Sequence, residues 1–530
     1  MKKREIAVGK LSDLEDGEMK EVEADGRQIL LARIKGKIHA TGAHCTHYGA
    51  PLAEGYLSGE RIVCPWHHAC FNAVTGELEE PPAFDSLPRF DVKIKGSEIF
   101  VILPEESSDR RTPPMKKRKP DDERQFVILG GGAAGFMAAQ TLREEGFTGR
   151  IVMITREDRA PYDRPNLSKD YLQGHAEPGW MPLRADDFFA EHDIEIFREK
   201  EATKVDARAK EITFKDGMIL EYDSLLIATG GIPRSLPFQT DAQKNVFLLR
   251  GFDDSDRIIA SAEEGSRAVI VGASFIGMEA ASSLRTRGCR VTVVAPDKVP
   301  FEKTLGAEIG QLFQKIHERK SVKFKLGTKI KSFEGEEQAN RVVLENGEQV
   351  EADFVVVGIG VTPATEFIEG VKLHEDGGVI ADEFLCAAEG LYAAGDIAHF
   401  PDQRTGELTR IEHWRLAMQQ GRCAARNMLG GKTALTAVPF FWTTQFDATL
   451  TYVGHVIDWD RIIVDGDVAR QDFLAFFVKD DKIRAVAGMN RDREMASFEE
   501  KIRLGEMPSA AQIEEDSASE KAYRRVPGLF

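Results

Sequence analysis

The first 104 residues have the hydrophobic pattern of short β-strands. Apolar runs of three to eight residues alternate with turns that contain Gly and Pro, which is typical of an all-β unit. The runs are 28–34, 61–63, 91–94 and 98–103. We therefore predict that the chain begins with an all-β domain.

A different pattern, strand–helix–strand, begins near residue 125 and occurs twice. Each copy has a short apolar run, a helix-like segment and a second apolar run. The copies comprise 125–129, 133–145 and 150–154, and then 267–271, 274–287 and 290–294. Such βαβ units build parallel sheets that bind nucleotides. The pattern predicts two nucleotide-binding domains.

The remaining segments connect or complete these domains. Residues 104–125 contain four prolines and almost no apolar side chains, so we predict an exposed linker. The basic residues of 110–119 are interpreted as part of its solvated surface. Beyond residue 430 the pattern is β-rich again at 449–457 and 472–477, with a helix near 495–504. The last dozen residues are polar and predict a loose tail.

Composition and charge narrow the possible partners. The chain has 70 Lys and Arg against 87 Asp and Glu, a net charge of −17, which argues against nucleic acid and against docking on an anionic membrane. No apolar run approaches the ~20 residues of a membrane span, and the N-terminus lacks the apolar stretch of a signal peptide. Six cysteines are too few for a disulfide-built scaffold. We expect a cytoplasmic location and no membrane insertion.

Two loops of the first domain carry a possible metal site. Cys45 and His47 are followed by Cys64 and His67, so each loop offers one thiolate and one imidazole. This donor set suits zinc or a 2Fe–2S cluster. The β-rich context and the turn-forming Gly and Pro residues favour the cluster, and zinc remains the alternative. The other cysteines form no Cys-x-x-Cys pair and are interpreted as structural.

The four residues and the continuation Phe71–Gly76 resemble the Rieske family. The resemblance implies that Cys45 and Cys64 hold one iron, whereas His47 and His67 hold the other. The positions of an extra disulfide and a Ser donor, found in high-potential members, are occupied by Ala50, Trp66 and Ala69, which implies a potential near about −150 mV.

His68 departs from the family, which usually has Gly after the second histidine ligand. Three interpretations are open. His68 fills a solvent-facing position, it strains the loop, or it replaces His67 as a ligand.

The first strand–helix turn contains Gly130, Gly132 and Gly135. Glycines with this spacing let the backbone approach a pyrophosphate at a helix N-terminus. Two later strand ends, Ala228-Thr229-Gly230 and Gly395-Asp396, accompany the motif. Together they resemble flavoproteins with two dinucleotide-binding domains, and the resemblance implies that these residues bind FAD. Glu157, after the second strand, is the candidate for the adenosine ribose.

The second fingerprint, Gly272, Ser274 and Gly277, resembles the nicotinamide-binding half of the same family. Glu279 lies early in the following helix. It either reaches the nicotinamide or is an acidic residue that the helix dipole favours. Ala295 stands where an NADH-specific acidic residue is expected, so NADH and NADPH both remain candidates.

The segment 161–169, PYDRPNLSK, resembles the ferredoxin-reductase and apoptosis-inducing-factor-like branch. In that branch, residues matching Arg164, Lys169 and Arg250 lie along the flavin. The resemblance also places Trp442 near the isoalloxazine, where the alternative is a core tryptophan.

An N-terminal Rieske domain ahead of such a reductase implies a multidomain protein with an all-β domain, two Rossmann-like α/β domains and a C-terminal α+β domain. The expected boundaries are 1–104 for the Rieske domain, 105–124 for the linker, 125–245 and 362–430 for the FAD domain, 246–361 for the NAD(P) domain and 431–530 for the C-terminal domain.

The implied function is electron transfer from NADH or NADPH through FAD to a 2Fe–2S cluster. The hydride chemistry belongs to the cofactors, and the protein positions them. The final acceptor, an oxygenase or a small redox protein, is open, as is the choice between a monomer and a homodimer. The alternatives are an NADH-responsive redox sensor and a subunit of a nitrite-reductase-like system.

Overall fold

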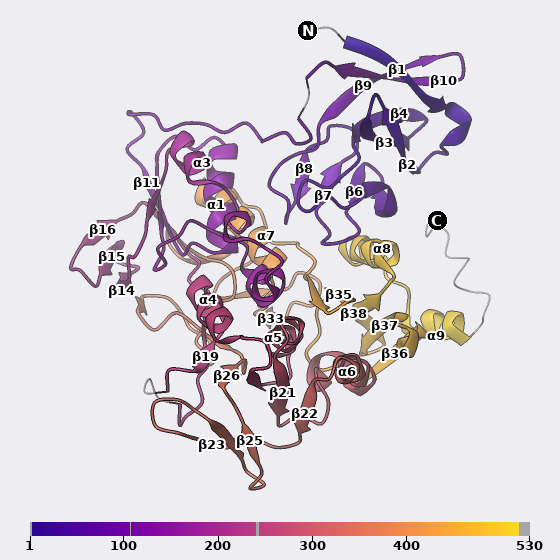
Figure 1. Cartoon of the computed structure of the whole chain (residues 1–530). Coiled ribbons are helices and arrows are strands. Elements are labelled where there is room, and N and C mark those ends of the chain that lie inside the picture. The colour runs from indigo at the N-terminus through magenta and orange to yellow at the C-terminus, as the bar shows by residue number, and fades with distance from the viewer. Residues whose placement is uncertain (1–2, 107, 240–242, 519–530) are drawn as a thin grey trace.

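The computed structural model describes residues 3–106, 108–239 and 243–518, and Figure 1 shows the arrangement of its elements. The N-terminal domain is all-β, as predicted. One six-stranded antiparallel sheet has the order β1 (Lys3–Lys10), β10 (Glu98–Pro104), β9 (Arg89–Lys95), β4 (Lys37–Gly42), β3 (Arg27–Ile34) and β2 (Met19–Ala24). A smaller sheet has the order β5 (Tyr56–Ser58), β6 (Arg61–Val63), β7 (Cys70–Asn72) and β8 (Leu78–Glu80).

The first nucleotide-binding domain is built around a six-stranded sheet whose central strands are parallel. Its order is β13 (Ile194–Phe197), β12 (Arg150–Ile154), β11 (Gln125–Leu129), β17 (Ser224–Ile227), β31 (Leu391–Ala393) and β30 (Cys386–Ala388). Apolar side chains are buried on both faces of β11, β12 and β17, which explains their uninterrupted hydrophobic runs. The last two strands come from the chain after it has completed the second domain.

Helices α1 (Ala133–Glu144) and α7 (Trp414–Met428) pack against each other in this first domain (Figure 1). Gly421 lies at their contact. A Cβ at this position would lie 2.2 Å from the carbonyl oxygen of Ala134. The close approach of the two helices therefore depends on the absence of a side chain.

The second nucleotide-binding domain has a five-stranded parallel sheet. Its order is β19 (Val246–Leu248), β26 (Phe354–Val357), β20 (Arg267–Val271), β21 (Arg290–Ala295) and β22 (Lys323–Leu326). The helices of this domain are α4 (Phe252–Ser261), α5 (Phe275–Thr286) and α6 (Glu302–Arg319). Both predicted strand–helix–strand units are present, with ends within two residues of the predicted ones.

The C-terminal domain is an antiparallel sheet with two helices. The strand order is β34 (Phe440–Gln445), β35 (Ala448–Gly454), β38 (Lys482–Met489), β37 (Asp472–Lys479) and β36 (Arg461–Asp467). Helix α8 (Asp492–Leu504) lies between this sheet and the N-terminal domain, and α9 (Ala510–Ala518) follows (Figure 1). The predicted tail, 519–530, lies outside the described residues.

Short elements complete the two nucleotide-binding domains. The strands are β14 (Ala202–Asp206), β15 (Glu211–Phe214), β16 (Ile219–Glu221), β18 (Gly231–Pro233), β23 (Ile330–Glu334), β24 (Arg341–Leu344), β25 (Gln349–Glu351), β27 (Val361–Pro363), β28 (Ile368–Glu369), β29 (Val379–Ile380), β32 (Ala398–Pro401) and β33 (Leu408–Thr409). The helices are α2 (Asp170–Gln173) and α3 (Asp186–Glu191). No helix among the described residues is long and apolar enough to span a membrane.

The linker is exposed, as predicted, but it is fixed to the first nucleotide-binding domain. The amide of Lys116 donates to the carbonyl of Arg143 at 2.9 Å, and that of Lys119 donates to Thr148 at 2.8 Å. The amide of Arg118 donates to the carboxylate of Asp193 at 3.0 Å. The second half of the linker therefore follows the surface of the reductase.

We predict that Gly421→Ala separates α7 from α1. Overpacking of a tight contact costs about 1–3 kcal/mol, and the carbonyl oxygen of Ala134 belongs to the backbone, so it cannot rotate away. Denaturant unfolding of the purified protein measures the loss. Gly179→Ala is the control, because a Cβ there meets open space. Equal stability of the two variants would contradict this account of the helix pair.

Candidate active site

A cavity of about 440 Å³ lies where the two nucleotide-binding domains and the C-terminal sheet meet. A second cavity of about 290 Å³ adjoins it and shares several lining residues. The predicted flavin-binding residues gather here. The first cavity is lined by Gly132, Arg164, Lys169, Ala228, Gly230, Arg250, Glu279, Gly395, Asp396 and Trp442, and the second adds Gly130, Glu157 and Thr229. Two joined cavities of this size fit an extended dinucleotide.

The glycine loop between β11 and α1 shapes the junction of the two cavities. Gly130 has φ +132°, and a Cβ there would lie 2.1 Å from the carbonyl oxygen of Ala228. A Cβ on Gly135 would lie 1.9 Å from the carbonyl oxygen of Gly130. Only glycine allows this turn, and it leaves the unpaired amides at the start of α1 beside the cavity. Such amides bind a pyrophosphate, so the loop fits FAD.

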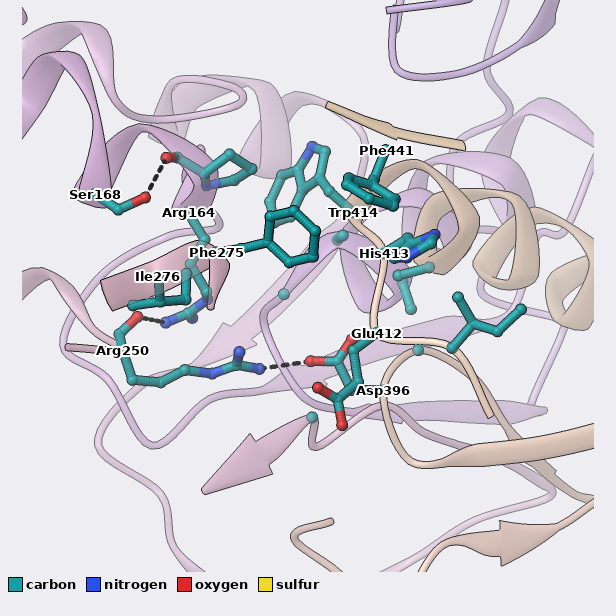
Figure 2. A pocket seen from close by; sticks show the side chains of 18 of the residues that line it. Arg164, Ser168, Arg250, Phe275, Ile276, Asp396, Glu412, His413, Trp414 and Phe441 are labelled. Carbon is teal, nitrogen blue, oxygen red and sulfur yellow. Dashed lines mark hydrogen bonds and ion pairs between the residues drawn. The ribbon is translucent and has the colours of Figure 1, made fainter. Parts of the chain in front are cut away.

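Hydrogen bonds and ion pairs connect charged side chains across the boundary between the cavities, and Figure 2 shows the part from Arg164 through Arg250 to Asp396. Arg164 donates to the carboxylate of Glu157 at 2.8 Å and to the carbonyl of Arg250 at 2.7 Å. Arg250 in turn pairs with Asp396 at 2.8 Å. Burial raises the pKa of Glu157, but Arg164 and Tyr162 outweigh it and lower the pKa below its ordinary value. Glu157 is therefore an ionised acceptor, as binding to ribose hydroxyls requires.

Glu279 joins three separate elements. Its buried carboxylate accepts hydrogen bonds from Ser168 at 2.6 Å, Lys169 at 2.8 Å and Thr443 at 2.7 Å. It is the fifth residue of α5, so the interpretation as a first-turn residue favoured by the helix dipole is wrong. The carboxylate instead holds the Lys169 ammonium at the cavity.

The second fingerprint has the same backbone geometry as the first. Gly272 has φ +108°, and a Cβ there would lie 2.2 Å from the carbonyl oxygen of Gly358. A Cβ on Gly277 would lie 2.2 Å from the carbonyl oxygen of Gly272. Ser274 precedes α5 as its N-cap. None of the three lines either cavity, but the neighbouring Phe275 and Ile276 line the first one.

The four predicted cluster ligands converge at the tips of two loops in the N-terminal domain. Cys45 and Cys64 are both buried, and the ring centroids of His47 and His67 lie 5.0 Å apart. Within the described residues, Nδ1 of His47 is buried and has no hydrogen-bond partner. Burial lowers the pKa of His47 to about 3, so the imidazole is neutral, the form that binds metal. These features fit a 2Fe–2S cluster.

Trp442 lies between the ligand cage and the first cavity. Its ring centroid is 4.4 Å from that of His67, and it also lines the cavity. The side chain is half-buried and also packs against the core of the C-terminal domain. A single indole therefore separates the predicted ligand from the predicted flavin site.

His68 is buried, so the interpretation of a solvent-facing position is wrong. The residue has φ +57°, the left-handed conformation for which glycine is usual. Its ring stacks on Phe440 at 4.1 Å, and Nδ1 donates to the carboxylate of Glu499 in α8. These contacts place His68 in the interface between domains, and its Nε2 is buried without a hydrogen-bond partner among the described residues.

Glu499 also pairs with a buried arginine of the first nucleotide-binding domain. Arg415 in α7 lies 2.9 Å from Glu499 and donates to the carbonyl of Pro81 at 2.9 Å. Burial raises the pKa of Glu499, but Arg415 and His68 lower it to about 2. Arg61 pairs with the neighbouring Glu500 at 3.0 Å. The junction of three domains is thus a buried, charged network.

The sequence did not indicate Glu499, Arg415 or Arg410. Arg410 donates to the carbonyl of Asp396 at 2.7 Å and to Glu412 at 2.6 Å, which places it at the edge of the first cavity. Glu499 and its neighbouring glutamate lie near the apolar face of α8. Carboxylates are rarely buried without a charged partner, so this position is the signal that could have indicated a buried ion pair.

Three family models match successive parts of the chain. They are the Rieske [2Fe-2S] domain at residues 4–91, pyridine nucleotide-disulphide oxidoreductase at 124–421 and the reductase C-terminal domain at 440–523. Together they confirm the predicted fold class and the resemblance on which it was based.

Known proteins are similar either to nearly the whole chain or to about two thirds of it. Human (Homo sapiens) apoptosis-inducing factor 3 is 39% identical over 522 residues, which cover 96% of this chain and 86% of that protein. Putidaredoxin reductase from Pseudomonas putida is 31% identical and covers 68% of this chain and 87% of its own length. The crystal structure of the covalent putidaredoxin reductase–putidaredoxin complex has a TM-score of 0.69 at 29% identity, covering 72% of this chain and 94% of that one.

We predict that Glu499→Gln destabilises the protein at neutral pH, because Arg415 loses its buried counter-charge. Breaking a buried pair in this way costs about 3–5 kcal/mol. Denaturant unfolding of the variant and the native protein measures the difference. Glu494→Gln is the control. Its partly exposed pair with Arg491 at 3.4 Å should contribute roughly 0.5 kcal/mol or less.

The native protein and Glu499→Gln should also differ in how their stability responds to acid. The folded pKa of Glu499, about 2, lies below the ordinary value of 4.5, so its ionisation stabilises the fold fully above 4.5 and progressively less as the pH falls toward 2. The stability gap between native protein and Glu499→Gln should therefore narrow when unfolding is measured below pH 4.5. A gap that is constant with pH would contradict the charge assignment.

Proposed function

The chain belongs to the pyridine nucleotide-disulphide oxidoreductase family, and from that premise we propose that its N-terminal domain is a built-in first acceptor for electrons leaving the flavin. The family models and relatives make it an FAD-dependent NAD(P)H oxidoreductase with a Rieske 2Fe–2S cluster. The proposal adds a path between these cofactors inside one chain. The observation that carries it is the 4.4 Å contact between the rings of His67 and Trp442.

The residues of the first cavity would hold the flavin and the nicotinamide. The α1 loop with Gly130 and Gly132 would bind the pyrophosphate, and Glu157 the adenosine ribose. The second fingerprint, at the start of α5, would bind NAD(P)H. When bound, the flavin accepts a hydride and gives up electrons one at a time, which a Rieske cluster can accept.

Two side chains would orient the reacting groups. Lys169 would face the flavin, held by its 2.8 Å pair with Glu279. Trp442 would bring its indole against the flavin on one side and against His67 on the other. Neither needs to exchange a proton in this role, because their contribution is position and the exclusion of water.

The outer acceptor would be a small redox protein or an oxygenase component. The support is the name of a solved relative, a reductase in covalent complex with putidaredoxin. We propose a cytoplasmic location, since none of the six cysteines, all within the described ranges, forms a disulfide, as is usual in a reducing compartment.

Anaerobic titration with NADH and with NADPH tests the proposed path. The visible absorption of the flavin and the EPR signal of the cluster are followed together. We expect flavin bleaching and then a Rieske-type EPR signal within one turnover. A flavin that bleaches while the cluster stays oxidised would overturn the proposal, and a long-lived reduced complex would instead indicate a redox sensor.

We predict that Trp442→Leu slows electron transfer from flavin to cluster, whereas flavin reduction by the nicotinamide keeps its rate. Removal of the indole leaves a gap beside His67. Stopped-flow absorption separates the two steps, and Trp442→Phe, which keeps an aromatic ring, should be affected less. Equal rates in the Leu variant and the native protein would exclude Trp442 from the path.

A further inference from the structure

The docked position of the N-terminal domain creates a problem for onward transfer. His67 faces the reductase through Trp442, so this side of the cage is covered. An electron acceptor outside the chain can reach this side only after the domain undocks. Otherwise it must receive electrons at another part of the surface of the N-terminal domain. The contacts that hold the dock decide between these routes.

Those contacts are buried, charged and distributed over both sides of the interface. His68, Glu499 and Arg415 have side chains at most 2% exposed. Arg184 adds a bidentate pair with the buried Asp85, at 2.7 and 2.9 Å. Undocking would break the pairs of His68 with Glu499 and of Arg184 with Asp85, whereas Glu499 and Arg415 would stay together on the reductase. All contacts across the interface would have to be exchanged for contacts with water at the same time. The linker also follows the reductase surface through Lys116 and Lys119.

One aromatic residue connects the ligand cage to solvent in the docked state. The ring of Tyr48 lies 4.2 Å from that of His47 and 5.8 Å from that of His67. Its side of the cage is open, since Tyr48 is 50% exposed and Trp66, next to His67, is 41% exposed. The hydroxyl of Tyr48 donates to Asp163 of the reductase, which fixes the ring across the domain boundary.

We propose that the N-terminal domain stays docked during turnover and that a basic one-electron carrier protein collects electrons at the exposed surface around Tyr48. The inference rests on the proposed function, because it needs a cluster that is filled from the flavin. Electrons would enter the ligand cage on the side of Trp442 and leave it on the side of Tyr48.

The charge around Tyr48 determines the kind of partner. The carboxylate of Asp163 accepts the hydrogen bond from the Tyr48 hydroxyl, and the carboxylate of Asp170 lies within electrostatic range of it. Asp170 is exposed, and the whole chain carries a net charge of −17. An exposed carboxylate beside an exposed aromatic side chain, on a protein with a negative net charge, favours a partner with a basic face and speeds their encounter at low salt.

The electron count sets the stoichiometry. One NADH loses a hydride, which carries two electrons, and becomes NAD⁺. Each carrier protein accepts one electron, so two carriers are reduced for every NADH and one proton is released to water. No further oxidant or reductant is needed.

A crosslink that fixes the dock tests the first half of the proposal. Glu54 and Asp492 are exposed, on opposite sides of the interface, and within electrostatic range of each other. The holoprotein with Glu54→Cys and Asp492→Cys is joined by a short bismaleimide, and each single variant is treated in the same way as a control. Cytochrome c serves as the basic one-electron acceptor.

We expect the crosslinked protein to reduce cytochrome c at the rate of the uncrosslinked protein. Loss of cytochrome c reduction, with the cluster still reduced by NADH in EPR, would show that the domain must undock and would overturn the inference alone. If NADH does not reduce the cluster even in the uncrosslinked protein, that result would instead contradict the proposed function.

Variants of Tyr48 test the exit. Tyr48→Leu should slow cytochrome c reduction several-fold and leave flavin-to-cluster transfer and the EPR g-values unchanged, whereas Tyr48→Phe, which keeps the ring, should retain the native rate. Unchanged rates in the Leu variant would overturn the exit assignment.

Hydrogen exchange supplies a readout that is independent of turnover. Cytochrome c should protect the peptides around 44–50 and 163–172 at low salt, and this protection should weaken in Asp170→Asn. Protection confined to another surface would contradict the proposed docking site.

Discussion

The arrangement of the redox site depends on one buried carboxylate. Glu499 of α8 contacts His68 of the N-terminal domain and Arg415 of the first nucleotide-binding domain, and all three side chains are almost fully buried. Burial of charge is expensive unless each partner is satisfied. A domain that docked at a slightly different angle would leave at least one of these charges unpaired. The network therefore selects one docked orientation more strongly than an apolar contact could.

Strand β34 links the docked orientation of the N-terminal domain to the geometry of the redox site. Side chains two residues apart lie on the same face of a strand, so Phe440 and Trp442 point in the same direction. They contact consecutive histidines of the N-terminal loop, Phe440 at His68 and Trp442 at His67. Once Glu499 fixes His68 against Phe440, the ring of His67 must meet Trp442. The departure from glycine at position 68 thus helps to place His67 against Trp442, the contact on which the proposed electron path depends.

The same strand connects the path to the nucleotide side. Thr443, which follows Trp442, donates to Glu279 at 2.7 Å, and Glu279 holds Lys169 at the cavity. A shift of β34 would therefore disturb both the indole and the lysine. The residues proposed to orient the flavin and those that orient the N-terminal domain share one rigid element.

Local features could be predicted from the sequence, and long-range contacts could not. The strands around Gly130 and Gly272 were predictable because a buried parallel strand and a glycine turn leave a local signature. The ligand spacing at Cys45 and Cys64 is local in the same sense. By contrast, His68 and Glu499 are 431 residues apart, and the sequence around either residue contains no pattern that indicates a contact with the other. The linker was misleading for a related reason. Its composition indicates exposure, which is correct, but its attachment uses backbone amides, which no composition reveals.

Covalent fusion of the acceptor domain changes what the interface must do. A reductase that meets a separate carrier needs a weak interface, because the carrier has to leave after each electron. In a fused chain the effective concentration of the attached domain is already high, so binding strength is not required for encounter. A buried, charged interface that fixes one orientation suits a domain that stays in place. The charges around Glu499 therefore support the proposed fixed dock, and a fixed dock requires that the cage be open on a second side. Tyr48 lies on that side, so the charged interface around Glu499 and the proposed electron exit at Tyr48 belong to one mechanism.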